Sequence, residues 1–177
     1  MNRMAKIWWR IVYNKRPEMY ATKKGVVMGV GNSFVDHPRF ASEPYLVRFG
    51  DNNRVSFGVS FLTHDGGRWV LDNLYPDENP FLKFGTIVIG SNNFIGANSI
   101  INPNVKIGDN CIVAAGSVVT KDIPSGEVWG GVPARFIMHT ETYYEKMRSN
   151  PISKQIDFDR LMDNKEKELK RVFGIEQ

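Results

Sequence analysis

The chain has 177 residues, of which 42% are hydrophobic and 24% charged, a balance that is typical of one globular domain with short appendages. Its formal net charge of +4 favours anionic ligands without indicating nucleic acid. The single cysteine, Cys111, excludes an internal disulfide, and no apolar run approaches the roughly 20 residues that cross a bilayer. We therefore expect a cytoplasmic protein.

The first 25 residues are predicted to be helical. Residues 4–16 carry an apolar face flanked by basic side chains, and a second short helix is predicted to start at Pro17 and to stop at Gly25. We expect both helices to pack on the end of the domain or on a neighbouring subunit. Contact of the basic amphipathic segment with a membrane surface is the less favoured alternative, because such stripes usually face a core.

Residues 89–124 carry a repeat of six: IGSNNF, IGANSI, INPNVK, IGDNCI, VAAGSV and VTKDIP. The first position is always Ile or Val, and the third and fourth positions are mostly turn formers. A period of six fits neither a helix nor a single strand. It predicts a short strand and a bend per hexad, with three hexads closing a triangular coil and coils stacking at about 4.8 Å. Less regular hexads occupy residues 49–66.

The repeat is interrupted and then ends. Between residues 66 and 84 an aromatic, proline-containing segment breaks the register, so we expect an extended loop leaving a corner of the coil. The C-terminal tail is predicted to hold helices at 141–149 and 156–173, with Gly174 as a C-cap. The expected organisation is an N-terminal helical segment (1–25), a repeat domain (26–138, with the loop insertion at 66–84) and a helical tail (139–177).

The hexads, together with "VAAGSVVTKDIP" and "GGVPARFI", resemble the hexapeptide-repeat acyltransferases. The stretch "EPYLVRFGDNNRVSFGVSFLTHDGG" is similar to the sugar O-acetyltransferases of bacterial surface-polysaccharide pathways, relatives of the maltose, galactoside and serine acetyltransferases. The resemblance implies an all-β, left-handed parallel β-helix with N- and C-terminal helices. It also implies a homotrimer with active sites at subunit interfaces, acetyl-CoA as co-substrate and no metal.

His64 is the candidate general base. It lies where the regular coil gives way to the loop, and a neutral imidazole accepts a hydroxyl proton at cytoplasmic pH. The resemblance implies this role; the alternative is a corner histidine that bonds a loop carbonyl. Asp65 is a candidate to orient the imidazole, with a main-chain carbonyl as the alternative. His37 and His139 are expected to be structural or surface residues.

The resemblance also implies a coenzyme A site. Small side chains let a pantetheine arm approach the backbone, and cationic side chains bind phosphate. Taken singly, each matching position also fits a purely structural or solvated role. These positions are Ala97 and Ala115 for the pantetheine arm, Thr120 and Lys121 for phosphate, and Pro133 and Arg135 at the adenosine end.

The acceptor side is less defined. Trp69 and Tyr75, in the loop, are candidates to stack on a sugar face, although an aromatic loop equally suits packing on a neighbouring subunit. Asn32 is a further candidate, by analogy, for reaching the site from the adjoining subunit. Cys111 is expected to serve packing.

The sequence thus predicts an acetyl-CoA-dependent O-acetyltransferase that acts on a sugar or glycan precursor by direct attack of a hydroxyl. N-acetylation of an amino sugar, or O-acetylation of serine, is the alternative on the same scaffold. A non-catalytic assembly subunit is the alternative from another class. A zinc-dependent carbonic anhydrase is disfavoured, because its three-histidine site would need His37, His64 and His139 to converge.

Overall fold

The computed structural model describes residues 16–76 and 82–175, which divide into two compact units, residues 1–138 and 139–177. The predicted helix at 4–16 lies outside the described residues, apart from its last residue. The second N-terminal helix is confirmed as α2 (Pro17–Lys23), and the turn that follows it contains Gly25, whose φ of +101° suits glycine. Within the described ranges, no helix is long and apolar enough to cross a membrane.

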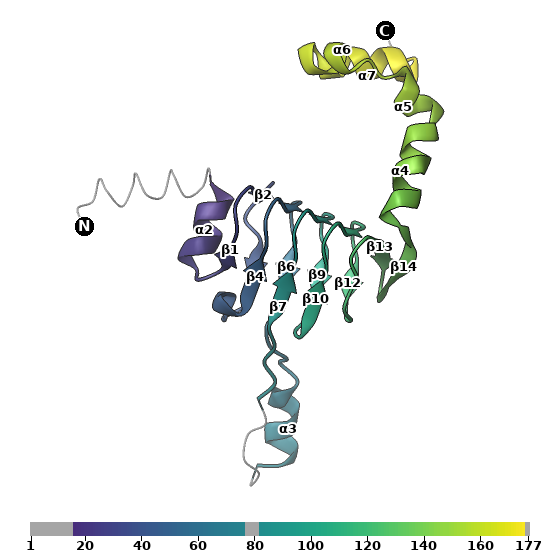
Figure 1. Ribbon diagram of the computed structural model, residues 1–177. Coiled ribbons are helices and arrows are strands. Elements are labelled where there is room, and N and C mark those ends of the chain that lie inside the picture. The colour runs from purple at the N-terminus through teal and green to yellow at the C-terminus, as the bar shows by residue number, and fades with distance from the viewer. Residues whose placement is uncertain (1–15, 77–81, 176–177) are drawn as a thin grey trace, which may run out of the picture. The chain divides into compact units, whose positions relative to one another are not determined.

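The first unit is built from short strands in three sheets, which we call A, B and C (Figure 1). Pairing is parallel within A, within C and from β2 to β13 in B. Sheet A contains β1 (Val27–Met28), β4 (Val47–Phe49), β7 (Ile87–Ile89) and β10 (Val105–Ile107). Sheet B contains β2 (Ser33–Phe34), β5 (Arg54–Val55), β8 (Phe94–Ile95), β11 (Ile112–Val113), β13 (Glu127–Gly131) and β14 (Ala134–His139). Sheet C contains β3 (Arg39–Phe40), β6 (Ser60–Phe61), β9 (Ile100–Ile101) and β12 (Val118–Val119).

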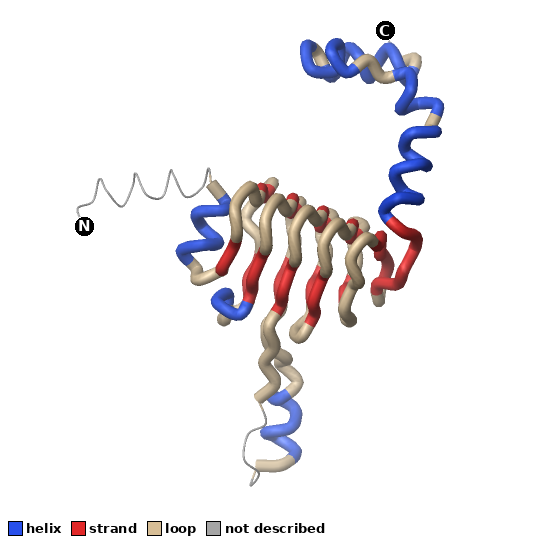
Figure 2. Tube along the Cα trace, viewed as in Figure 1, coloured by secondary structure: helices blue, strands red, loops and turns tan. Residues whose placement is uncertain are grey.

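From β1 to β12, successive strands belong to A, B and C in turn, so the chain runs as a three-sided coil with bends between short strands (Figure 2). In the regular part, residues 18 apart lie side by side: Ile95 pairs with Val113, and Ile101 with Val119. The spacing is 21 in the first coil and 40 across the coil that contains the insertion. The predicted triangular coil of three hexads is therefore observed.

The interior of the coil is filled by two positions of each hexad. The first-position residues are all buried: Ile89, Ile95, Ile101, Ile107, Val113 and Val119. The fifth-position residues are buried as well: Asn93, Ser99, Val105, Cys111, Ser117 and Ile123. Since each apolar side chain moved out of water contributes about 1.5–3 kcal/mol, these stacked ladders supply much of the stability of the unit. Cys111 serves packing, as predicted; its thiol donates to a backbone carbonyl, and burial raises its pKa.

The corners depend on the fourth position of the first five of these hexads. Asn92, Asn98, Asn104 and Asn110 have φ between 57° and 60°, and Gly116 has φ of 70°. Asparagine and glycine tolerate this left-handed conformation, whereas β-branched residues do not. Turn formers at this position therefore make the bend that starts the next side of the triangle.

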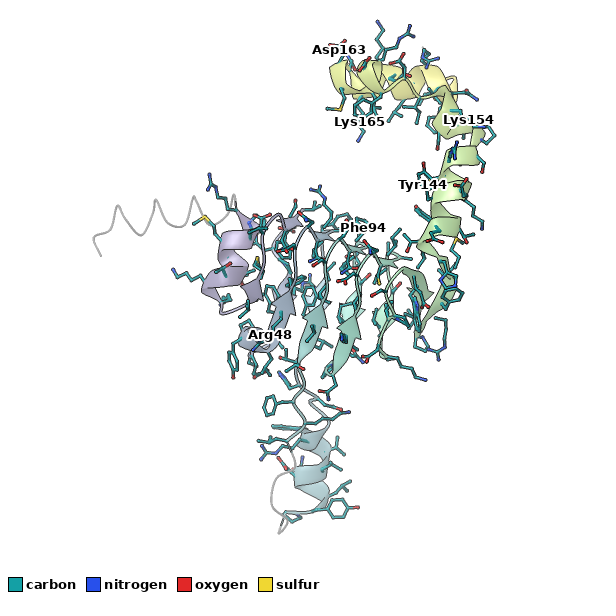
Figure 3. All side chains as sticks on the ribbon, in the orientation of Figure 1. Arg48, Phe94, Tyr144, Lys154, Asp163 and Lys165 are labelled. Carbon is teal, nitrogen blue, oxygen red and sulfur yellow. The ribbon has the colours of Figure 1, made fainter. Side chains whose placement is uncertain are left out.

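Alternate side chains of the strands point outward from the coil. Arg48 and Phe94, labelled in Figure 3, lie on the outer surfaces of sheets A and B, and Phe94 is 42% exposed. Trp129 packs against the core at the β13 end, where its indole nitrogen donates to Glu127 at 2.6 Å.

The second unit contains α4 (Thr140–Ser149), α5 (Pro151–Gln155), α6 (Phe158–Asp163) and α7 (Lys165–Phe173). The predicted helix at 156–173 is wrong as one element, because Asn164 breaks it and caps α7 through its side-chain oxygen. Gly174 is confirmed as a left-handed C-cap. Glu168 is 3% exposed and forms an ion pair with Arg171. This hydrogen-bonded pair, together with the Asp157 amide, lowers the pKa of Glu168 to about 2.

Candidate functional site

The insertion leaves the coil through a narrow two-stranded base. Backbone hydrogen bonds run from Gly85 N to Thr63 O at 2.8 Å and from Asp65 N to Lys83 O at 3.0 Å. Beyond this base the chain forms α3 (Arg68–Leu74), which stands away from the three sheets (Figure 1). The segment expected as a loop therefore contains a helix, and we call residues 65–83 the arm.

His64 lies at the base of the arm and is paired with Glu43. The Nδ1 atom of His64 lies 2.8 Å from Oε2 of Glu43, and the Thr63 hydroxyl donates to the same oxygen at 2.8 Å. Burial raises the pKa of the Glu43 carboxyl, but hydrogen bonds from His64, Thr63 and Ser42 outweigh it and hold the pKa below its usual value. An ionised Glu43 accepts the Nδ1 proton, which leaves the lone pair on Nε2 of the imidazole.

The exposure of this pair suits proton transfer. The Glu43 side chain is 14% exposed and that of His64 is 38% exposed. No hydrogen bond reaches Nε2 of His64 from the described residues, so this nitrogen is open to a ligand. The arrangement can take a proton from a hydroxyl at Nε2 and stabilise the resulting imidazolium through Glu43.

Glu43 was missed by the sequence reasoning, which offered Asp65 as the orienting acid. Asp65 instead accepts a hydrogen bond from Gly67 N at 2.9 Å and forms an ion pair with Lys83 at 3.3 Å. Asp65 belongs to the base of the arm, whereas Glu43 is the acid that lies at hydrogen-bond distance from Nδ1 of His64. The missed signal was the length of the first coil: because Phe40 pairs with Phe61, the residue three places after Phe40 comes to lie beside His64.

Both ends of the Asn32 side-chain amide form hydrogen bonds within the coil. Its nitrogen donates to Gly29 O and Gly50 O, and its oxygen accepts from the backbone and side chain of Asn53. Asn53 in turn bonds Asn93, so the three asparagines form a ladder along one corner. Asn32 therefore has a structural role within its own chain, and its reach to the site of an adjoining subunit stays a prediction.

Trp69 and Tyr75 lie at opposite ends of α3, and they are 80% and 59% exposed. No described contact joins either ring to His64. Their role in acceptor binding stays a prediction.

The residues expected at coenzyme A divide between two corners. Ala97 and Ala115 lie one coil apart at the corner between B and C, joined by a backbone hydrogen bond from Gly116 N to Ala97 O at 2.7 Å. Thr120 and Lys121 are exposed at the corner between C and A, the corner that also carries His64 two coils away. By strand spacing this separation is about 10 Å along the coil.

Two further residues of the expected coenzyme A set follow the last coil. Pro133 is exposed after a cis peptide bond at the end of β13. Arg135 is exposed on β14, and its guanidinium donates to Ala134 O at 2.9 Å. The small residues and the exposed cations fit an extended anionic ligand, and their roles remain predictions.

Within residues 16–76 and 82–175, no three His, Cys, Asp or Glu side chains are grouped as metal ligands. His37 instead contacts Asp36 at 3.5 Å and packs edge-on against Tyr20.

Comparison with known proteins places the chain in a family. Residues 86–121 match the bacterial transferase hexapeptide (six repeats) model. Protein CapG of Staphylococcus aureus is 40% identical over 168 residues, which cover 94% of this chain and 93% of CapG. The chain belongs to the hexapeptide-repeat transferase family. The family prediction is confirmed, and with it the prediction of an acyltransferase enzyme.

Other hexapeptide-repeat transferases match part of the chain. The galactoside O-acetyltransferase of Escherichia coli (strain K12) is 57% identical over 138 residues, covering 68% of this chain and 64% of that protein. The crystal structure of a maltose O-acetyltransferase from Clostridium difficile 630 superposes with a TM-score of 0.51 at 27% identity, covering 66% of this chain and 71% of that one. The serine acetyltransferase of Neisseria gonorrhoeae superposes with a TM-score of 0.51 at 28% identity, covering 71% and 44% respectively.

Proposed function

We propose that this hexapeptide-repeat transferase is an acetyl-CoA-dependent O-acetyltransferase acting on a sugar or glycan precursor. The observation that carries the proposal is the His64–Glu43 pair, with Nδ1 held at 2.8 Å and Nε2 open. The galactoside and maltose O-acetyltransferases among its relatives support a sugar hydroxyl as acceptor. We further propose that the coil is a left-handed β-helix and that the enzyme is a cytoplasmic homotrimer, with the arm packing on a neighbouring subunit.

The reaction follows from the pair. His64 Nε2 takes the proton of the acceptor hydroxyl while its oxygen attacks the thioester carbonyl carbon. Glu43 stabilises the imidazolium that forms. When the carbon–sulfur bond breaks, the imidazolium returns the proton to the coenzyme A sulfur, so the imidazole is neutral again and the products are an acetyl ester and a free thiol.

The donor is held by residues other than this pair. Ala97 and Ala115 leave room for the pantetheine arm beside the backbone, and Lys121 and Arg135 supply positive charge for its phosphates. Thr120 and Pro133 complete the proposed set. Since the phosphates lie far from the thioester, the cations act on binding rather than on the chemical step.

The test is release of coenzyme A thiol from acetyl-CoA by the purified full chain, with pyranosides, nucleotide sugars, glucosamine and serine as acceptors. We expect turnover with a hydroxyl-bearing sugar, lowered about 10²- to 10⁴-fold by His64→Ala with little change in coenzyme A affinity. Turnover confined to glucosamine nitrogen or to serine would favour the alternative acceptors. The absence of coenzyme A binding in calorimetry would instead indicate an assembly subunit.

A further inference from the structure

Phe84 faces His64 across the base of the arm. The two residues form an antiparallel bridge, and the two backbone hydrogen bonds at the base of the arm lie one residue to either side of it. In such a pair the two residues exchange no hydrogen bond with each other, and their side chains stand on the same face of the ribbon with Cβ atoms about 4.5–5.5 Å apart. The backbone thus fixes Phe84 beside the imidazole.

The rings of Phe84 and His64 lie side by side and are both partly exposed to solvent. Their centroids are 6.0 Å apart with an interplanar angle of 61°. Phe84 is 46% exposed, and the His64 side chain is 38% exposed. A large apolar ring left this open next to a candidate base is unusual for a residue that serves only the core.

We propose that Phe84 is a substrate-binding residue that stacks on the apolar C–H face of a cyclic acceptor whose hydroxyl lies at His64 Nε2. This inference rests on the proposed O-acetyltransferase function and makes its acceptor more specific. The face of an aromatic ring is electron-rich and attracts the weakly positive C–H groups of a pyranose, and the contact also removes apolar surface from water. Serine has no such face, so the ring favours sugars over the serine alternative.

The position of Phe84 separates it from the aromatic residues expected from sequence. Trp69 and Tyr75 flank the exposed helix α3, whereas Phe84 belongs to the base of the arm and contacts the candidate base directly. A hydroxyl held at an imidazole nitrogen lies within a few ångströms of its own sugar ring, so an aromatic side chain this close to His64 can contact that ring without a further motion of the arm.

The experiment measures steady-state kinetics of the full chain with a pyranoside that the wild type acetylates, and with glycerol as an acyclic acceptor. For Phe84→Ala we expect the KM for the pyranoside to rise about 3- to 10-fold. The KM for acetyl-CoA, the KM for glycerol and the rate of acetyl-CoA hydrolysis by water should stay unchanged. Phe84→Tyr should restore the pyranoside KM, and Phe94→Ala, which removes an equally exposed ring from the outer face of sheet B, should behave as wild type.

Three outcomes would overturn the inference. An unchanged pyranoside KM in Phe84→Ala would show that no stack forms. An equal fall in turnover with the pyranoside, glycerol and water would show that the ring acts only by positioning His64. A wild-type protein that acetylates no cyclic acceptor would overturn the proposed function as well, whereas the first two outcomes would leave that function intact.

Discussion

Replacing Glu43 by Gln tests the site most directly, because it removes one charge from the pair with almost no change in shape. The glutamine oxygen can still accept from Nδ1 of His64 and from the Thr63 hydroxyl, which share one carboxylate oxygen in the wild type. The amide nitrogen then takes the place of the other carboxylate oxygen. The imidazole therefore keeps its tautomer and loses the negative charge that stabilises the imidazolium.

The size of the effect follows from Coulomb's law. At about 4 Å and an effective dielectric of about 20, opposite unit charges interact by about 4 kcal/mol. A proton about half transferred in the transition state gives about half of that value, or about 30-fold in rate. Because the His64 side chain is 38% exposed, water screens part of the interaction. We expect Glu43→Gln to lower kcat about 5- to 30-fold with little change in the KM for acetyl-CoA.

Asp65→Asn is the matched control, since it makes the same chemical change in the next residue after His64. Asp65 contacts Gly67 and Lys83 and has no hydrogen bond to the imidazole. We expect this variant to keep kcat within about threefold of wild type. The kcat of both variants is measured by release of the coenzyme A thiol. If Asp65→Asn loses more activity than Glu43→Gln, the assignment of the orienting acid to Glu43 is wrong.

Three further predictions concern donor binding and stability. Replacing both Lys121 and Arg135 by Ala should raise the KM for acetyl-CoA about tenfold, weaken the salt dependence of this KM and change kcat little. If the variant keeps the wild-type KM at low and at high salt, the two residues are solvated surface charges that do not bind the donor. Ile101→Ala should cost about 2–5 kcal/mol of unfolding free energy, whereas Asn98→Gly at a left-handed corner should cost less than about 1 kcal/mol, and thermal melts giving the reverse order would refute the assigned interior. Glu168 has a folded-state pKa of about 2 against an ordinary 4.5, so its stabilising ion pair should be complete above pH 4.5 and lost as pH falls towards 2. Circular dichroism should show a loss of helix over this acid range, and the Glu168→Gln variant should not show this pH dependence.

The repeat predicted the interior because it constrains both geometry and composition. Ile89, Ile101 and Val119 occupy the first position of their hexads, and a triangular coil points the side chains at this position inward. All three are buried. The tail was harder, because its helices are short and the break at Asn164 is set by a single capping side chain. α3 was missed because the arm is defined in sequence only by the loss of the repeat.

The site was predicted only in part, since one of its members is local in sequence and the other is not. His64 stands out because it ends the regular hexads beside two glycines. Glu43 gives no local signal, because its partner lies 21 residues away and the first coil is longer than the 18-residue coils of the regular repeat. Pairing across coils of unequal length cannot be read from a motif; it needs the register of the strands.

The position of His64 explains how a repetitive coil acquires a unique site. His64 occupies the fourth position of its hexad, where Asn98 and Asn104 make left-handed corners. His64 has no positive φ; the arm replaces the tight corner by the antiparallel base, in which His64 is bridged to Phe84. In a regular coil the corners are nearly the same on every level, so a ligand would find no distinct binding site at any one of them. The interruption at this corner thus sets an open imidazole beside the Phe84 ring, and the register of the coil before it places Glu43 against the same imidazole.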